Sequence, residues 1–349
     1  MSFFRKNIDL MEAYVPGEQP PPGTRVIKLN TNENPYPPSP AAMEALRGIE
    51  PELLRRYPDP FSRKVCRNVS RVFGVPEDWV LVGNGSDEIM SMIIRACSGP
   101  QRRVAYPMPT YVLYRTLAQM QEADYVEIPF DDEYNLPLSN LIETNAAVTL
   151  IASPNSPSGT LAPISHLKEL AMNLQGVLVV DEAYTDFADG NALELVKAHD
   201  NVIVLRTLSK GYSLAGLRLG FGIANPDLLK GLFKIKDSYN VDAISCIVGA
   251  AAIEDQQHKK MNAEKVKKSR VKLSSDLAHL GFQIWPSQSN FLLVRPPEGN
   301  AERLYLLLKG RGILVRYFKQ PRLDDKLRIS VGTEEQNTIL IDALSGLLL

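Results

Sequence analysis

The residues best suited to chemistry lie around Lys210, in the run Thr207-Leu-Ser-Lys-Gly-Tyr-Ser-Leu-Ala-Gly-Leu-Arg-Leu-Gly220. A lysine that attacks an aldehyde must first lose its charge. Lys210 follows the apolar segment Val202–Leu205, and a second cation, Arg218, lies further along the same run. Partial desolvation and neighbouring positive charge both favour the uncharged amine. The run is therefore typical of a lysine that holds an aldehyde cofactor, not of one on a solvated surface.

Asp181 ends the apolar run Val177-Leu-Val-Val, so its carboxylate is expected to emerge from a buried strand into a polar cleft. Paired with a ring nitrogen that becomes protonated, this acid would stabilise the cation and make the ring an electron sink. Taken alone, Asp181 would more often cap a turn or bind magnesium. The magnesium alternative is weaker because the chain has no Gly-Lys dipeptide, and hence no phosphate loop of the Walker kind.

Asn155 lies in the turn Ser153-Pro-Asn-Ser-Pro-Ser-Gly-Thr160, which follows a predicted strand. Its amide could donate to a phenolate oxygen, and Tyr184, just beyond Asp181, could donate to the same oxygen. A bare Pro-Asn-Ser-Pro motif is most often only a turn. Tyr111 is expected to begin a helix near another strand end and could stack on a flat ring, although an aromatic residue there is more often part of the core.

A phosphate site is indicated by Gly83-Asn-Gly-Ser-Asp87, which supplies flexible backbone amides where a helix begins with Ser86 as its expected cap. Thr207, Ser209 and Arg218 add two hydroxyls and a guanidinium. A dinucleotide site is not favoured, because position 88 is Glu and not the third glycine of a GxGxxG fingerprint.

An α/β sheet must position these candidates, because short apolar runs alternate with amphipathic stretches from about residue 79 to residue 224. Several runs lack apolar/polar alternation, as expected of strands that helices cover on both faces. The runs are Trp79–Val82, Arg103–Ala105, Tyr125–Ile128, Ala147–Ala152, Val177–Val180, Val202–Leu205 and Leu219–Ala224. Open α/β sheets bind ligands beyond the carboxyl ends of their strands, and the candidate residues fall there.

The pattern changes after about Asp242, where a long helical stretch is expected to run to Leu280, followed by short strands at Phe282–Ile284 and Phe291–Val294. The segment from Pro16 to Pro22 is too rich in proline for a helix and is expected to wrap as an arm. We therefore predict a large domain over residues 41–255, and a small domain that combines residues 1–40 with residues 256–349.

Composition excludes several classes of protein. With 349 residues, 44% of them hydrophobic and 23% charged, the chain is an ordinary globular protein. Its 39 Lys and Arg against 40 Asp and Glu leave a net charge of -1, so we expect no nucleic-acid or membrane partner. The three cysteines form no CxxC pair and the four histidines show no HExxH spacing, so we expect free thiols and no metal site. Without a secretory signal or a long apolar run, we expect a cytoplasmic protein.

The combination of Pro154-Asn155, Asp181-x-x-Tyr184 and Ser209-Lys210 followed by Arg218 resembles the fold-type I pyridoxal-phosphate aminotransferases over nearly the whole chain. Within that group the chain is similar to the histidinol-phosphate aminotransferases. The motifs behind this narrower likeness are Leu29-Asn-Thr-Asn-Glu-Asn-Pro-Tyr36, Arg56-Tyr-Pro-Asp59, Gly83-Asn-Gly-Ser-Asp-Glu88 and Leu327-Arg-Ile-Ser-Val-Gly332. Ser158 departs from the family, in which threonine is more usual, and this bears on the substrate more than on the cofactor.

The resemblance implies a large domain with a mostly parallel seven-stranded sheet between helices, plus a small α+β domain. It implies that Lys210 forms the Schiff base with pyridoxal phosphate and then moves the proton, and that Asp181 pairs with the pyridine nitrogen. Asn155 and Tyr184 would bind the ring oxygen, and Tyr111 would stack on the ring. The residues implied to surround the phosphate are Ser86, Asp87, Thr207, Ser209 and Arg218.

The same resemblance implies a homodimer in which Tyr57 reaches the cofactor phosphate of the neighbouring subunit. Arg328, helped by Arg316, would bind the anionic end of the substrate, because a guanidinium fits either a carboxylate or a phosphate. Tyr14 and Asn32 would line the pocket from the N-terminal arm. Without the resemblance, the two arginines would be surface residues and Tyr57 an ordinary turn residue.

The implied reaction is a ping-pong transamination of histidine biosynthesis, between histidinol phosphate and 2-oxoglutarate. An aromatic or other amino-acid aminotransferase, or an O-phosphothreonine decarboxylase, of the same fold remains open, because the cofactor residues do not distinguish these enzymes. A regulator that only senses a ligand with this fold is the alternative from another class. Such regulators usually carry a DNA-binding domain, and we expect none here because the chain has no basic patch.

Overall fold

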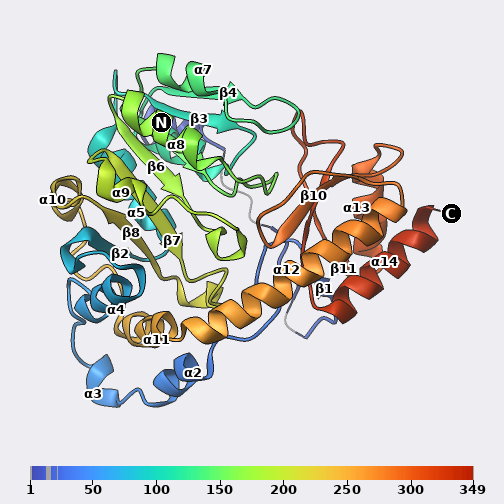
Figure 1. Ribbon diagram of the computed structural model, residues 1–349, viewed down its shortest axis with the longest axis horizontal. Coiled ribbons are helices and arrows are strands. Elements are labelled where there is room, and N and C mark those ends of the chain that lie inside the picture. Colours follow the sequence, from blue (N-terminus) through green and yellow to red (C-terminus); the bar gives the residue numbers. More distant parts are fainter. Residues whose placement is uncertain (1, 13–16, 22, 349) are drawn as a thin grey trace.

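The computed structural model describes residues 2–12, 17–21 and 23–348. Its largest element is a seven-stranded sheet with the order β2-β8-β7-β6-β5-β3-β4 (Figure 1). Neighbouring strands pair in parallel except β8, which runs antiparallel to both β2 and β7. The strands are β2 (Val80–Gly83), β3 (Val104–Met108), β4 (Tyr125–Pro129), β5 (Val148–Ala152), β6 (Val177–Asp181), β7 (Val202–Thr207) and β8 (Gly220–Ala224). The mostly parallel sheet and the positions of its seven strands are confirmed.

Both faces of this sheet are covered, because successive side chains of a strand point to opposite faces. Val80 and Val82 of β2 pack into one apolar core, and Leu81 between them packs into the other. The helices of the first core include α4 (Arg63–Phe73), α8 (Ile164–Asn173), α9 (Leu195–Ala198) and α11 (Ala243–Glu254). Those of the second are α5 (Ser86–Cys97), α6 (Leu113–Met120) and α10 (Pro226–Phe233). Burial on both faces explains why the strands lack apolar/polar alternation.

The C-terminal part builds a separate antiparallel sheet with the order β12-β13-β10-β9. Its strands are β9 (Gln283–Ile284), β10 (Phe291–Arg295), β12 (Arg316–Tyr317) and β13 (Leu327–Ser330). It shares a core with α12 (Gln256–His279), α13 (Ala301–Gly310) and α14 (Glu334–Leu348). Near the start of the chain, β1 (Ile27–Lys28) pairs with β11 (Ile313–Leu314), and Leu29 is buried in this core. The N-terminal segment therefore packs with the C-terminal part, whereas the exact domain boundary stays a prediction.

The structure corrects three local expectations. The helical stretch after Asp242 is two helices, because the chain breaks at Asp255, whose carboxylate accepts a hydrogen bond from the amide of His258 at 3.1 Å and caps α12. Gly85, not Ser86, is the N-cap of α5, since its φ of 78° is a conformation that glycine adopts without strain. Tyr111 lies just before α6 and does not begin it.

The proline-rich arm from residue 16 to residue 22 is described only in part, since Pro16 and Pro22 lie outside the described residues. Within it, the Glu18 carboxylate pairs with Lys309 of α13 at 2.9 Å. The backbone oxygen of Glu18 accepts a hydrogen bond from Asn30 at 2.9 Å. The described part of the arm therefore lies against the C-terminal half of the molecule.

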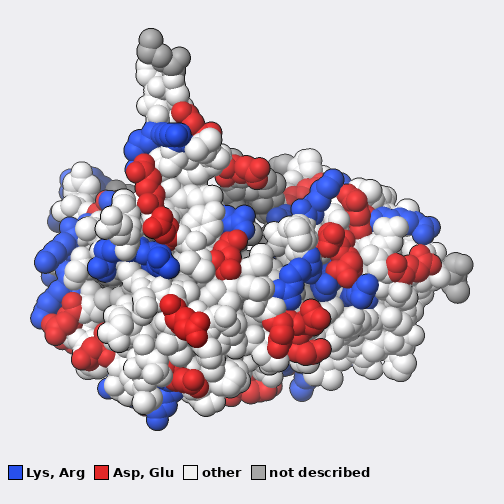
Figure 2. Space-filling model, turned by 90° about the horizontal axis from the view of Figure 1, so that it is seen from above, with Lys and Arg blue, Asp and Glu red and all other residues white. Residues whose placement is uncertain are grey.

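Figure 2 shows basic and acidic side chains interspersed over one face of the molecule, not gathered into one basic field. This mixture agrees with the near-neutral net charge of -1 and with a protein that holds anions only at local sites. None of the helices within residues 2–12, 17–21 and 23–348 is long and apolar enough to cross a membrane.

Candidate functional site

The candidate residues gather at one edge of the seven-stranded sheet. Asp181 ends β6 and lies in register with Ala152, the last residue of β5, and with Leu205 near the end of β7. Because parallel strands end at the same edge, the loops that follow β5, β6 and β7 emerge side by side. The loops after β5 and β7 carry Asn155 and Lys210, and Tyr184 follows β6.

Asp181 is a buried acid held in a fixed orientation. Its Oδ2 accepts a hydrogen bond from the Tyr114 hydroxyl at 3.0 Å, and its Oδ1 accepts one from the amide of Ala183 at 3.1 Å. Burial raises the pKa of Asp181 to about 6, against the effect of the Tyr114 hydrogen bond. A buried carboxylate of this kind gains most from a cationic partner, and a protonated ring nitrogen is such a partner.

The start of α5 forms one wall of the site. Helix N-termini expose unpaired amides that bind anions, and the Arg218 guanidinium lies beside this end of α5. Arg218 donates to Ser209 Oγ at 3.2 Å and to Asp87 Oδ2 at 3.4 Å. The Thr207 hydroxyl donates to the same Ser209 oxygen at 2.9 Å. Amides, hydroxyls and a guanidinium together are the donor set that suits a phosphate.

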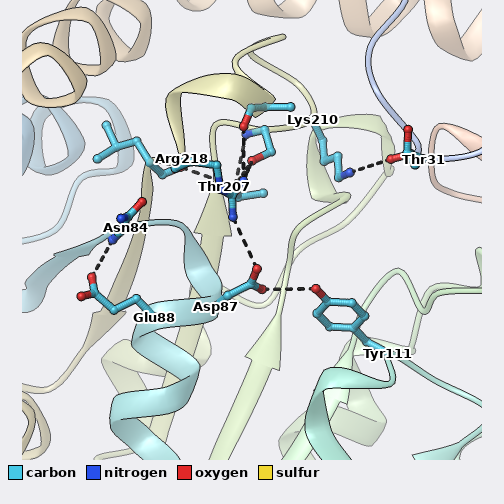
Figure 3. Close-up of polar contacts among 11 residues, drawn as sticks. Thr31, Asn84, Asp87, Glu88, Tyr111, Thr207, Lys210 and Arg218 are labelled. Atoms are coloured by element: carbon cyan, nitrogen blue, oxygen red, sulfur yellow. Dashed lines mark hydrogen bonds and ion pairs between the residues drawn. The ribbon is translucent and has the colours of Figure 1, made fainter. Parts of the chain in front are cut away.

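Figure 3 shows the Asp87 carboxylate between Arg218 and Tyr111, whose hydroxyl donates to Asp87 Oδ1 at 3.5 Å. Burial raises the pKa of Asp87, and the charges of Arg218 and Lys210 oppose this rise. The Tyr111 ring also packs edge-on against Tyr114, with 5.9 Å between the ring centroids. Tyr111 therefore lies at the sheet edge with its ring fixed by Tyr114, which also binds Asp181.

Glycines keep this wall open. A Cβ at Gly85 would lie 2.7 Å from Arg218 Nη2, and a Cβ at Gly220 would lie 2.7 Å from the carbonyl carbon of Gly85. The close approach of Arg218 thus requires a residue without a side chain at position 85, and the close approach of β8 to the backbone before α5 requires one at position 220. The residues present fit a phosphate-bearing cofactor.

We expect a Gly85→Ala variant to bind the pyridoxal phosphate that the resemblance implies at least about tenfold more weakly, because the new Cβ displaces Arg218. The variant should also unfold about 1–2 kcal/mol more easily, because alanine is strained at a φ of +78°. Titration of the cofactor-free protein measures the first effect and thermal unfolding the second. Gly74→Ala is the matched control, because Gly74 also has a positive φ, of +65°, but no atom lies within 4 Å of its added Cβ. Equal cofactor affinity in the two variants would contradict the assignment.

Two residues for which the sequence predicted no role in the site hold the glycine loop before α5. Glu88 Oε2 accepts hydrogen bonds from the amide of Asn84 at 2.6 Å and from Asn240 Nδ2 at 2.7 Å. Asn240 also donates to the Val82 carbonyl at 3.1 Å. In the sequence, Glu88 was noticed only because it occupies the position of the third glycine of a GxGxxG fingerprint. Asn240 lies far from this loop in the sequence, and no motif pointed to it.

The Lys210 side chain extends toward the N-terminal segment (Figure 3), and its Nζ donates to the Thr31 carbonyl at 3.2 Å. The same Nζ lies 5.6 Å from the centre of the Tyr184 ring. The Tyr184 hydroxyl accepts a hydrogen bond from Asn32 Nδ2 at 2.9 Å, and its ring packs edge-on against Phe291. The structure thus brings Lys210, Tyr184 and Asn32 together.

Asn155 is buried in its turn and makes contacts on both sides of its amide. Its Nδ2 donates to Ser158 Oγ at 2.9 Å, and its Oδ1 accepts from the Thr110 hydroxyl at 2.7 Å. Thr110 precedes Tyr111, so this contact ties the turn after β5 to the loop after β3. Asn155 is held in place beside the loop that carries Tyr111.

Arg316 and Arg328 lie directly opposite each other on the paired strands β12 and β13. Both guanidinium groups lie over the Phe318 ring, at 5.3 and 5.5 Å from its centroid. Arg328 also donates to Ser156 Oγ and to the Asn30 carbonyl, both at 3.0 Å. Like charges opposite each other on a sheet are unfavourable, and an anion between them relieves this repulsion. Ser156 places this pair of arginines next to the turn that holds Asn155.

Of the remaining predicted residues, Tyr57 is expected to serve the neighbouring subunit's site and not this one. Tyr57 is 80% exposed and stacks on Tyr239, with 4.5 Å between the ring centroids. Tyr14 lies outside the described residues. Within the part of the chain that the structure describes, no group of His, Cys, Asp and Glu residues could hold a metal ion.

Comparison with known proteins agrees with this geometry. The sequence model of one protein family, described as aminotransferase class I and II, matches residues 24–344. The chain is 62% identical over 347 residues to histidinol-phosphate aminotransferase 1 of Trichormus variabilis, with 99% of each chain covered. It is 44% identical over 335 residues to histidinol-phosphate aminotransferase of Rhodopirellula baltica, with 95% of this chain and 92% of the relative covered.

Among solved structures, the chain is similar to histidinol-phosphate aminotransferase of Sinorhizobium meliloti in complex with pyridoxal-5'-phosphate. The TM-score is 0.90 at 24% sequence identity, with 100% of this chain and 98% of that one covered. At this identity the likeness is one of fold.

Proposed function

The chain belongs to the class I and II aminotransferase family, and on this premise we propose that it transfers the amino group of histidinol phosphate to 2-oxoglutarate. The products are imidazole-acetol phosphate and glutamate. The observation that most directly supports this reaction is the position of Lys210 Nζ. It lies 5.6 Å from the centre of the Tyr184 ring, at the sheet edge where Asp181 is buried. The relatives from T. variabilis and R. baltica, which bear the name of this activity, support the substrate.

The cofactor of the proposal is pyridoxal phosphate, which supplies an aldehyde and an electron-withdrawing ring when it is bound. Lys210 Nζ would hold the cofactor at its aldehyde and, once free, would move the proton of the substrate carbon. Asp181 would hold the protonated ring nitrogen, and Asn155 and Tyr184 would bind the ring oxygen. The first amides of α5, with Ser86, Thr207, Ser209 and Arg218, would hold the phosphate.

The two arginines of β12 and β13 account for both substrates. A guanidinium fork binds a phosphate or a carboxylate with similar geometry. Arg328, supported by Arg316, therefore binds the phosphate of histidinol phosphate and, in the second half of the cycle, a carboxylate of 2-oxoglutarate. Asn32, which binds the Tyr184 hydroxyl at 2.9 Å, lines the pocket between these arginines and the cofactor.

We further propose that the chain acts as a homodimer in which Tyr57 serves the partner subunit's site. The support is the exposure of Tyr57 and of Tyr239, the aromatic residue on which it stacks. Exposed aromatic clusters of this kind mark protein interfaces. The stacking of Tyr57 on Tyr239 holds the Tyr57 ring in one orientation.

A panel of amino donors tests the proposed substrate. The purified protein, loaded with pyridoxal phosphate, is mixed with 2-oxoglutarate and either histidinol phosphate, phenylalanine or O-phosphothreonine. We expect kcat/KM for histidinol phosphate to exceed the other two values by about 100-fold or more, because the site pairs its buried polar groups with this donor alone. Release of carbon dioxide, followed in the same samples, separates decarboxylation from amine transfer. Preference for phenylalanine or phosphothreonine would refute the assignment.

A further inference from the structure

Directly after Lys210, the chain is in close contact with Asp186 at Gly211. Gly211 has no side chain, and a Cβ there would lie 2.5 Å from both Cβ and Cγ of Asp186. The carboxylate of Asp186 therefore fills the space beside the Lys210–Gly211 peptide. Asn34 Nδ2 donates to the carbonyls of Lys210 at 3.1 Å and Gly211 at 3.4 Å. The backbone that carries Lys210 thus contacts both Asn34 and Asp186.

Asp186 is itself fixed by Lys259 of α12. The Lys259 Nζ lies 2.8 Å from Asp186 Oδ1, and each of the two side chains is only 11% exposed. Burial lowers the pKa of Lys259, but the charge of Asp186 and the hydrogen bond to it raise the pKa above its usual value. Lys259 Nζ also lies 4.9 Å from the centre of the Tyr212 ring, whose hydroxyl accepts a hydrogen bond from Gln256 of α12. The start of α12 therefore contacts both Asp186 and Tyr212, the residue that follows Gly211.

A second cation of α12 holds the segment that follows Tyr184 and contains Asp186. Arg270 donates to the Phe187 carbonyl at 3.1 Å and to the Ser289 carbonyl at 2.7 Å, and its side chain is buried. Figure 1 shows α12 running from beside α11 to the C-terminal sheet, so the helix links the two parts of the molecule. The segment that directly follows Tyr184 is thus attached to α12 at two positions.

We propose that the Asp186–Lys259 ion pair positions Lys210 for the reaction, by holding the Lys210–Gly211 backbone against the side of α12. The proposal rests on the proposed function, because it concerns the lysine assigned to the cofactor. Asp186 and Lys259 touch neither cofactor nor substrate and are positioning residues. A small displacement of a reacting group costs up to about 100-fold in rate, so the pair affects the proton transfer at Lys210 Nζ more than substrate binding.

Four variants test the proposal in the full-length protein: Lys259→Met, Asp186→Asn, the two combined, and Lys259→Arg. We expect Lys259→Met and Asp186→Asn each to lower kcat by about tenfold to 100-fold, with KM changed by less than about threefold. The double variant should lose no more than either single variant, because both changes break one pair. Lys259→Arg, which keeps the charge, should recover most of the rate. The pH at which the visible absorbance of bound pyridoxal phosphate changes should shift in the first three variants and stay near the wild-type value in Lys259→Arg.

The matched control is Lys272→Met, on the same helix, because Lys272 pairs with Asp276 at 2.6 Å but is 67% exposed. It should leave kcat and the absorbance titration unchanged. Hydrogen exchange of residues 207–213 in the cofactor-free protein supplies a readout that needs no activity, and we expect faster exchange in Lys259→Met than in Lys272→Met. Lower thermal stability with unchanged kcat, titration and exchange would overturn the proposal, as would additive losses in the double variant. Absence of wild-type turnover would instead count against the proposed function, and the exchange experiment would still decide the positioning.

Discussion

The Lys210→Ala variant is expected to lose turnover by about 10³-fold or more, because in the proposed reaction one nitrogen bonds the cofactor and moves the proton. The apolar β7 before Lys210 and the contact of its Nζ with the Thr31 carbonyl at 3.2 Å place that nitrogen at the sheet edge next to Tyr184. The measurement is turnover with histidinol phosphate and 2-oxoglutarate, together with reduction of the loaded protein by borohydride and peptide mass spectrometry. The wild-type peptide that contains Lys210 should carry the cofactor mass.

The control for this variant is Lys230→Ala, which removes an exposed lysine that pairs with Asp227 on the surface of α10. It should keep full turnover and the cofactor mass on Lys210. A Lys210→Ala protein that turns over normally, or cofactor mass on another lysine of the wild-type protein, would contradict the role of Lys210.

The Asp181→Asn variant is expected to change activity and stability in opposite directions. Burial raises the pKa of Asp181 to about 6 in the folded protein, above the ordinary value of an aspartate. The folded state then binds more protons than the unfolded state between these two values, so the free energy of unfolding falls as pH rises through this window. At pH 8 the cofactor-free wild type therefore carries a buried charge that destabilises it. The neutral amide should stabilise the cofactor-free protein at pH 8 by about 1–3 kcal/mol.

Activity should fall in the same variant by about 10³-fold, because an amide cannot hold the ring nitrogen in its protonated form. Denaturant unfolding of the cofactor-free proteins at pH 5 and pH 8 measures the stability difference, which should be smaller at the lower pH. The control Asp189→Asn alters an aspartate in the loop after η2 (Thr185–Phe187) that is 72% exposed, and should leave turnover unchanged. An Asp181→Asn protein that is less stable than wild type at pH 8, or that keeps its turnover, would show that Asp181 has another role.

The strands and the residues at their ends could be predicted from the sequence, because burial on both faces leaves continuous apolar runs and function follows their carboxyl ends. Asp181 and Lys210 are such residues. The partners that hold them could not be predicted, since Tyr114 is 67 residues from Asp181 and Lys259 lies on a helix far along the chain from Asp186. Contacts between residues so far apart in the sequence depend on how the helices pack on the sheet, and no local sequence pattern encodes this packing.

The sequence-based predictions were also wrong about local backbone geometry at two helix starts. The preference of serine for helix caps predicted Ser86 as the cap of α5, but the approach of Arg218 requires glycine at the cap, with a positive φ at Gly85. The break at Asp255 was missed for a similar reason. Residues on both sides of it favour helix, and only the capping hydrogen bond to the His258 amide marks the new start.

Transfer of a labelled nitrogen tests the proposed function most directly. The loaded protein is incubated with histidinol phosphate that carries ¹⁵N in its amino group and with unlabelled 2-oxoglutarate, and the glutamate is analysed by mass spectrometry. We expect one labelled glutamate for each histidinol phosphate consumed, with imidazole-acetol phosphate as the second product. Label released as ammonia, or glutamate that stays unlabelled while the donor is consumed, would contradict an aminotransferase acting on histidinol phosphate.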